Sequence, residues 1–202
     1  MAKKTETAEE IKVILVGESG TGKTSLINTS IGIPFKENMI TSASNSFAPK
    51  EFQIDGKKYI LNLWDTIGQE KFRSLTKIFI KDSKIVIFVY DITNEKSFKE
   101  LEYWITTIKD ILKDEAVLGI AGNKQDLFKN EKVKEETARK YAQEKNIIFE
   151  LTSSKNRKTF EKLLEDLLKQ YIEKNGGSDQ SDSNAIKLGE KNSKGNNNKK
   201  FC

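Results

Sequence analysis

The chain has 202 residues with a formal net charge of +5, no histidine and a single cysteine, Cys202. This length fits one domain with a tail, and the composition excludes Ser-His or Cys-His nucleophilic machinery, histidine-ligated zinc and disulfides. Chemistry is therefore expected to rest on carboxylates, hydroxyls, amides, lysines and a hard metal ion.

The excess positive charge lies near the C-terminal end. From Ser183 to Cys202, five lysines against one glutamate give +4, which leaves +1 for the other 182 residues. We therefore expect an anionic membrane surface, and no nucleic acid, as the partner of this segment. The sequence shows no run of about 18 apolar residues and no apolar secretory signal in its first residues. These features predict a cytoplasmic protein.

The first predicted elements frame a glycine-rich turn. Ile11 to Val16 is a short apolar run typical of a strand buried on both faces, and a helix is predicted from Lys23 to about Ser30. Between them stands Gly17-Glu-Ser-Gly-Thr-Gly-Lys-Thr24, the pattern of a phosphate-binding loop. Lys23 is expected to reach the β- and γ-phosphates, and the Thr24 hydroxyl to bind Mg²⁺. The alternative is a turn that serves only as a helix cap.

The middle of the chain begins with a polar stretch from Gly32 to Ser46, which has no period and is long for a connection. Such stretches are functional or disordered. Glu51 to Ile54 and Tyr59 to Trp64 then predict a β-hairpin that turns at Asp55-Gly56. The remaining predicted elements are strands over 85–90, 117–121 and 147–151, and helices over 72–80, 97–112, 132–144 and 159–174.

Strands that alternate with helices predict an α/β fold. We expect the three-layer sandwich of a P-loop NTPase, with helices on both faces of a six-stranded, mainly parallel sheet and one antiparallel edge strand from the hairpin. The predicted organisation is a flexible N-terminus (1–10), one domain (11–174) and a basic tail (175–202). The tail is rich in Gly, Ser, Asn and Lys, a composition that predicts disorder.

Two polar motifs follow predicted strands, where such sheets bind their ligands. After the hairpin, Asp65 is expected near Mg²⁺ through a water, Gly68 offers its N–H to a terminal phosphate, and Gln69 can orient an attacking water. An Asp-x-x-Gly turn without a site role is the alternative. Further on, Asp126 of Asn123-Lys124-Gln125-Asp126 can accept two adjacent guanine N–H groups, whereas adenine would leave it unpaired.

Thr152-Ser153-Ser154-Lys155 follows the last predicted strand and is expected to close over the base with backbone N–H groups. With this segment, the motifs make the chain resemble, over roughly Lys12 to Tyr171, a small GTP-binding protein of the Ras superfamily, and within it the Rab family. Three further segments are similar to Rab segments: Leu61-Asn-Leu-Trp64, Lys71-Phe-Arg-Ser-Leu-Thr76 and Phe88-Val-Tyr-Asp-Ile-Thr93.

The resemblance implies a monomeric molecular switch that binds GTP or GDP with Mg²⁺, hydrolyses GTP and serves vesicle traffic. It also implies exchange factors, activating proteins and effectors as partners. By the same resemblance, Phe35 packs against the guanine. The nucleotide-binding residues then expected are Ser19, Gly20, Thr21, Gly22, Lys23, Thr24, Ser25, Phe35, Ser42, Asp65, Gly68, Asn123, Lys124, Asp126, Ser153, Ser154 and Lys155. Thr24, Ser42 and Asp65 are the expected Mg²⁺ site, and Gln69 is the expected catalytic residue.

Two departures from the family pattern face the γ-phosphate. A gapless alignment places Ser42, with Thr41 beside it, where the family has its Mg²⁺-binding threonine, and either residue can fill that role. Ile67 stands where the family has a small alanine, and its β-branched side chain would crowd the switch. We therefore expect slow hydrolysis and an altered response to activating proteins. The alternative is a nucleotide-binding scaffold that has lost switching; an ATP-driven P-loop enzyme disagrees with the Asn123 motif.

The tail resembles a Rab prenylation terminus. Cys202 follows Lys199-Lys200, and a lipid chain joined to a basic stretch gives stable anchoring. Ile186 and Leu188 resemble the apolar pair that Rab tails offer to the prenylation machinery. The expected location is the cytosolic face of an intracellular membrane, with peripheral attachment through the tail. An unmodified terminal cysteine on a solvated tail is the alternative.

Overall fold

The structure is a computed structural model that describes residues 8–37, 47–65 and 80–176. Its strands are β1 (Glu9–Val16), β2 (Phe47–Ile54), β3 (Lys57–Asp65), β4 (Ile85–Asp91), β5 (Val117–Asn123) and β6 (Ile148–Leu151). Its helices are α1 (Lys23–Ser30), α3 (Glu95–Lys99), α4 (Leu101–Leu112), α5 (Glu135–Lys145) and α6 (Arg157–Gly176), with a 3-10 helix, η2 (Gln125–Asn130).

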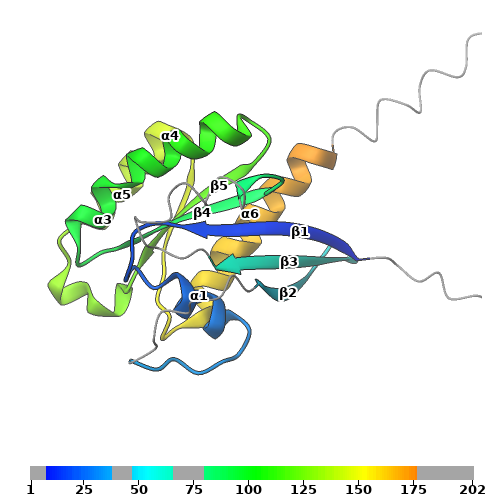
Figure 1. Cartoon of the computed structure of the whole chain (residues 1–202). Helices are drawn as coiled ribbons and strands as arrows, with labels where there is room; N and C mark the ends of the chain where they lie inside the picture. Colours follow the sequence, from blue (N-terminus) through cyan, green and yellow to red (C-terminus); the bar gives the residue numbers. More distant parts are fainter. Residues whose placement is uncertain (1–7, 38–46, 66–79, 177–202) are drawn as a thin grey trace, which may run out of the picture.

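The six strands form one sheet in the order β2-β3-β1-β4-β5-β6. Only the β2–β3 hairpin pairs antiparallel, and the other four strand pairs of this sheet are parallel. Helices lie on both faces of the sheet (Figure 1). The predicted fold class is therefore confirmed, including the antiparallel edge strand.

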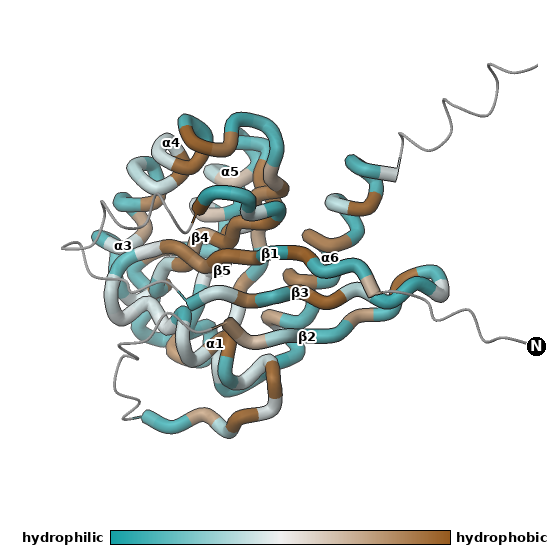
Figure 2. The backbone as a smooth tube through the Cα atoms, turned by 45° about the vertical axis from the view of Figure 1, so that its right-hand side comes forward, coloured by the Kyte–Doolittle hydropathy of each residue, from teal (hydrophilic) through white to brown (hydrophobic). Residues whose placement is uncertain are grey.

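Alternate residues of β4 belong to two separate cores. Phe88 and Tyr90 pack with residues of α4 and α5, whereas Ile87 and Val89 pack with residues of α1 and α6. All four side chains are fully buried. Burying an aliphatic or phenylalanine side chain contributes about 1.5–3 kcal/mol, so a strand covered on both faces becomes an uninterrupted apolar run. In Figure 2, hydrophobic residues are concentrated in the central strands β1, β4 and β5.

The helix predicted over 97–112 begins earlier and is divided. Asn94 caps α3, because its side-chain oxygen accepts a hydrogen bond from the Lys96 N–H at 3.1 Å. Glu100 lies between α3 and α4 and keeps a right-handed helical backbone, with φ −68° and ψ −13°. The N–H of Trp104 donates to the Glu100 carbonyl at 3.2 Å. The two helices therefore follow each other almost continuously.

The prediction that Lys132 and Val133 are helical was wrong, because α5 begins at Glu135. The backbone N–H groups of both residues donate to the Ile92 carbonyl, at 2.8 and 3.1 Å. These bonds hold the segment against the residue that follows β4. Lys134 then has an extended backbone, with ψ 141°, so the helical conformation starts only at Glu135. Val133 is 4% exposed and fills the core from the segment that precedes α5. In the sequence, the spacing of Val133 from the apolar residues of α5 matches the apolar face of a helix.

The first strand begins, and the last helix ends, two residues beyond the predicted bounds. β1 begins at Glu9 rather than Ile11, and the Glu9 carboxylate accepts hydrogen bonds from Lys57 at 2.8 Å and from the Tyr171 hydroxyl at 3.1 Å. α6 ends at Gly176 rather than Lys174. The predicted N-terminal segment up to residue 7, the helix over 72–79 and the tail from residue 177 lie outside the described residues. Among the described helices, none has the length and apolar character needed to cross a membrane.

The Tyr90 hydroxyl leads to a stability prediction. It is buried and has no hydrogen-bond partner among the residues that the structure describes. Burial raises the pKa of this hydroxyl well above its ordinary value. Because an unsatisfied buried polar group costs about 1–3 kcal/mol, Tyr90→Phe should raise the free energy of unfolding by about 1 kcal/mol, measured by urea denaturation.

The matched control is Tyr141→Phe. The Tyr141 hydroxyl donates to the Glu102 carboxylate at 2.7 Å, so its removal should lower the free energy of unfolding by about 1 kcal/mol. Equal losses in Tyr90→Phe and Tyr141→Phe would show that the Tyr90 hydroxyl has a partner in solution.

Candidate functional site

The candidate site gathers loops from the carboxyl edge of the sheet. Residues 17–22 connect β1 to α1, Asp65 ends β3, Asn123 ends β5, and residues 152–156 lead from β6 to α6. Adjacent parallel strands bring their carboxyl ends to the same edge, which is where open α/β sheets bind ligands. Predicted site residues far apart in the sequence are thus neighbours in space.

Lys23 lies inside the glycine-rich loop. Its ammonium donates to the carbonyls of Gly17 and Glu18, both at 2.9 Å, and the residue is 5% exposed. Burial lowers the pKa of Lys23 to about 8, while the carboxylates of Asp65 and Glu18 act in the opposite direction. The amine therefore remains mainly protonated at pH 7. The loop encloses a positive charge at the start of α1, where the helix N-terminus adds further attraction for an anion.

Thr24 and Asp65 bring two oxygens together from separate elements. The Thr24 hydroxyl on α1 donates to Asp65 Oδ2 at the end of β3, at 2.5 Å. No cluster of three or more His, Cys, Asp or Glu side chains suited to a metal occurs within 8–37, 47–65 and 80–176. Mg²⁺ at nucleotide sites commonly uses one or two protein oxygens together with phosphates and waters. The Thr24–Asp65 pair fits that requirement.

Asn123 joins the loop after β5 to the glycine-rich loop. It is 1% exposed, and its side-chain amide donates to the Thr21 carbonyl at 2.8 Å across 102 positions of sequence. A buried hydrogen bond of this kind is costly to break. The two motifs are therefore parts of a single site.

Asp126 is held as an ionised acceptor. One carboxylate oxygen accepts from the Ser153 hydroxyl at 2.6 Å, and the other lies 3.1 Å from the Lys155 ammonium. Burial raises the pKa of Asp126, but the hydrogen bonds from Ser153 and Lys155 outweigh it, so the pKa lies below its ordinary value. The carboxylate can thus accept hydrogen bonds from a ligand throughout the physiological pH range.

Most backbone N–H groups after β6 already have partners. Thr152 donates to the Gly122 carbonyl at 2.9 Å, Ser153 to the Thr159 hydroxyl at 2.9 Å, and Lys155 to the Ser153 hydroxyl at 3.2 Å. Within the described part of the chain, Ser154 is the residue of this segment whose N–H has no such bond. The expectation that several N–H groups close over the base is therefore narrowed to Ser154.

Phe35 lies beside the same loops. The Lys155 ammonium is 5.5 Å from the centroid of its ring, within cation–π range. Ser19 and Gly20 belong to the glycine-rich loop, and Ser25 lies in the first turn of α1. The other predicted site residues, Ser42, Gly68, Gln69 and Cys202, lie outside the described residues, as does Ile67.

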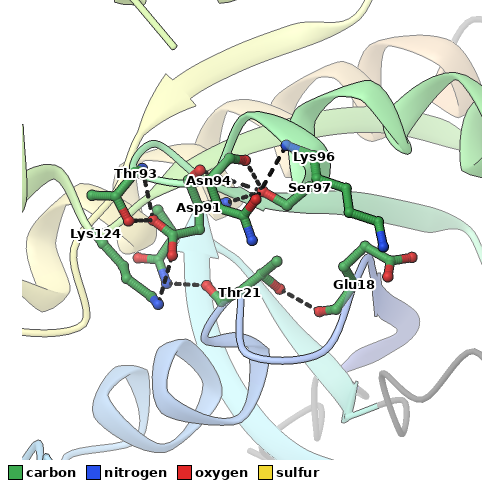
Figure 3. Close-up of polar contacts among 9 residues, drawn as sticks. Glu18, Thr21, Asp91, Thr93, Asn94, Lys96, Ser97 and Lys124 are labelled. Carbon is green, nitrogen blue, oxygen red and sulfur yellow. Dashed lines mark hydrogen bonds and ion pairs between the residues drawn. The ribbon is translucent and has the colours of Figure 1, made fainter. Parts of the chain in front are cut away.

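The sequence analysis missed Asp91. This residue ends β4 in register with Asn123, and its carboxylate forms an ion pair with Lys124 at 2.7 Å. Figure 3 shows Asp91 and Lys124 near Thr21 of the glycine-rich loop. A charged residue that ends an apolar strand at the ligand-binding edge was the available signal.

The family was identified by comparison with known proteins. A family model described as the Ras family matches residues 12–173. The chain belongs to the Ras family. Similar proteins include "Ras-related protein Rab-21" of Canis lupus familiaris, 40% identical over 166 residues that cover 82% of this chain and 74% of that protein. "Ras-related protein Rab-21" of Bos taurus is 41% identical over 162 residues, covering 80% and 73%.

A third relative is "Ras-related protein Rab-13" of Bos taurus, 36% identical over 166 residues that cover 82% of each chain. The family match and these relatives confirm the resemblance to a Rab-like small GTPase of the Ras superfamily. In this Ras-family chain, the glycine-rich loop and the Asn123 and Ser153 segments lie at one edge of the sheet, so the structure brings together the segments that were predicted to bind phosphate and base.

Proposed function

We propose that this chain is a guanine-nucleotide-dependent molecular switch that binds GTP and GDP with Mg²⁺, hydrolyses GTP and acts in vesicle and membrane traffic. The observation that carries the proposal is the 2.8 Å hydrogen bond from Asn123 to the Thr21 carbonyl. This bond joins the glycine-rich loop, which contains the Lys23 ammonium, to the segment that contains Asp126. A ligand with a phosphate end and a guanine end would satisfy both.

Different groups of the site would bind different parts of the nucleotide. Lys23 and the loop amides would hold the β- and γ-phosphates, and Asp126, with Asn123 and Lys124, would hold the base. Ser154 would offer its N–H to the base, and Phe35 would pack against the base.

Thr24 and Ser42 (or Thr41) would hold Mg²⁺, with Asp65 supporting it through a water. When bound, Mg²⁺ neutralises charge on the phosphates. Gln69 would orient the attacking water.

The family supports a proposal for regulators and location. Exchange factors, activating proteins and effectors would recognise the segments on either side of the β2–β3 hairpin, and the protein would act as a monomer. Prenylation at Cys202, together with the basic residues of the tail, would attach the protein peripherally to the cytosolic face of an intracellular membrane. An unmodified intact mass for protein extracted from membranes would exclude the lipid.

A competition assay tests the binding proposal. Fluorescent GDP is bound to the purified protein and displaced with GDP, GTP or ATP, with and without Mg²⁺. Guanine nucleotides should displace the probe at least about 10³-fold better than ATP, because adenine leaves Asp126 unpaired. Equal competition by ATP, or no binding of the probe, would overturn the proposal.

Ile67 carries a prediction about hydrolysis. Its β-branched side chain replaces the small residue that the family has beside the γ-phosphate, and crowding there would displace the hydrolytic groups. Ile67→Ala should raise the single-turnover rate of GTP hydrolysis about tenfold, which corresponds to about 1.4 kcal/mol of barrier. Equal, family-typical rates in the two proteins would remove Ile67 as a cause of slow hydrolysis.

A second candidate function is a nucleotide-binding scaffold that does not switch, and the departures from the family pattern at Ser42 and Ile67 favour it. Hydrogen exchange separates the two functions. A switch protects residues 33–47 and 67–80 more strongly with a GTP analogue than with GDP, whereas a scaffold shows equal protection with both nucleotides.

A further inference from the structure

We propose that Asp91 is a positioning residue of the nucleotide site: it holds the Lys124 side chain against the end of β4 and so slows nucleotide release. The inference rests on the proposed function, because Lys124 belongs to the motif assigned to the base. The sequence analysis included Asp91 only within the Phe88–Thr93 segment and gave it no role in binding.

The ion pair is built from a partly exposed lysine and a nearly buried aspartate. Lys124 Nζ lies 2.7 Å from Asp91 Oδ2, with side-chain exposures of 34% and 9% (Figure 3). The other carboxylate oxygen, Oδ1, accepts from both the N–H and the hydroxyl of Thr93, each at 2.8 Å. Both oxygens of Asp91 are therefore engaged, and the carboxylate has a fixed orientation.

The backbone of Asp91 is equally well fixed. Its N–H donates to the Ser97 hydroxyl at 3.0 Å, and that hydroxyl donates to the Asn94 carbonyl at 2.7 Å. The next residue, Ile92, donates to the Asn123 carbonyl at 3.1 Å. Asp91 is thus held at the end of a central strand, and its neighbour Ile92 is bonded to Asn123, the residue before Lys124.

Lys124 needs such an anchor. Its backbone is left-handed, with φ 67° and ψ 34°, a conformation that residues with side chains rarely adopt. It lies between Asn123, which contacts the phosphate loop, and Asp126, which is held by Ser153. A lysine side chain has four rotatable bonds, so without a partner it would sample many positions. The ion pair to Asp91 restricts it to the side of the site formed by β4.

The two carboxylate oxygens separate the proposed role from a structural one. Oδ1 serves the turn that leads from β4 to α3 through Thr93, whereas Oδ2 serves Lys124. Asp91→Asn retains an oxygen for Thr93 but presents an amide NH₂ to the ammonium. This substitution therefore removes the ion pair and leaves the acceptor of the turn in place.

The test is the dissociation rate of fluorescent GDP from the full chain. Asp91→Asn should release the nucleotide about tenfold faster than wild type, the change expected when one charge-assisted contact is lost. The same substitution is then made in a Lys124→Met background, which keeps an apolar stem but has no ammonium. There it should change the rate less than about twofold, because coupled residues are not additive. Equal acceleration in both backgrounds would assign Asp91 to the turn alone and overturn the inference.

Glu102→Gln is the matched control. Glu102 forms an ion pair of the same 2.7 Å length with Lys145 on α5, away from the loops of the site, so its replacement should leave GDP release unchanged. Thermal unfolding of each variant with GDP bound checks that the fold is retained. A wild-type protein that does not bind fluorescent GDP would end the proposed function. A wild-type protein that binds it, with an Asp91→Asn variant that releases it at the wild-type rate, would end only this inference.

Discussion

The Asp126→Asn protein should lose affinity for GDP and GTP by about 10³-fold or more and should bind xanthine nucleotides instead. Asp126 is an ionised carboxylate held by Ser153 and Lys155, and it can accept two adjacent N–H groups from guanine. An asparagine offers one acceptor and one donor, so it opposes one of those groups. Sites that hydrogen-bond a ligand discriminate by about 10⁴–10⁵-fold against an analogue that leaves their polar groups unpaired.

Xanthine has a carbonyl where guanine has its amine, so the amide NH₂ that the substitution introduces would meet an acceptor. Displacement of fluorescent GDP by GDP and by xanthosine diphosphate measures the change in both directions. Asp110→Asn, at an exposed carboxylate of α4, is the control and should leave both affinities unchanged. Unchanged GDP affinity in Asp126→Asn would mean that this carboxylate does not contact the base.

The features that the sequence predicted best are those set by local pattern. The buried strands β4 and β5 are continuous apolar runs because helices cover both faces, and the glycine-rich loop follows directly from strand to helix. The hairpin turn at Asp55-Gly56 also belongs to this class. Its β-strands differ from the prediction only in where they begin and end, since β2 starts at Phe47 rather than Glu51.

The errors lie where a tertiary contact overrides the pattern. Val133 has a helical position in the sequence, but its N–H bonds to Ile92, a residue of another segment. η2 is a short 3-10 helix without an apolar stripe, so the sequence has no hydrophobic periodicity that predicts it. Composition and spacing do not show which carbonyl will accept a hydrogen bond from an N–H that is distant in the sequence.

The candidate site shows the same division. The glycine-rich loop and the Asn123–Asp126 motif can each be recognised from the residue types and their spacing within one continuous segment. The Asp91–Lys124 pair instead depends on the register of β4 against β5, which places Asp91 beside Asn123. The hydrogen bonds that leave Ser154 as the available donor depend on Gly122 and Thr159 in the same way. Such contacts require the assembled sheet.

The Gly22→Ala protein should bind GDP about 100-fold more weakly than wild type. A Cβ at Gly22 would lie 2.3 Å from the side-chain nitrogen of Asn123, which donates to the Thr21 carbonyl. One of the two loops must therefore move, and the bond between them is lost. The broken buried hydrogen bond and the left-handed φ of +94° together cost about 3 kcal/mol, or about 100-fold in affinity.

Gly20→Ala separates the collision from backbone strain. Gly20 also has a left-handed φ, +78°, but a Cβ there would meet no heavy atom within 4 Å among the described residues. Strain alone should reduce GDP affinity by about 30-fold or less, since a left-handed residue costs about 1–2 kcal/mol. Equal losses in the two alanine variants would mean that Asn123 is not the cause. A third variant, Asn123→Ala, completes the comparison. If the collision acts through Asn123, combining Gly22→Ala with Asn123→Ala should weaken GDP binding by less than the product of the two single effects, because both remove the same bond between the phosphate loop and the base motif.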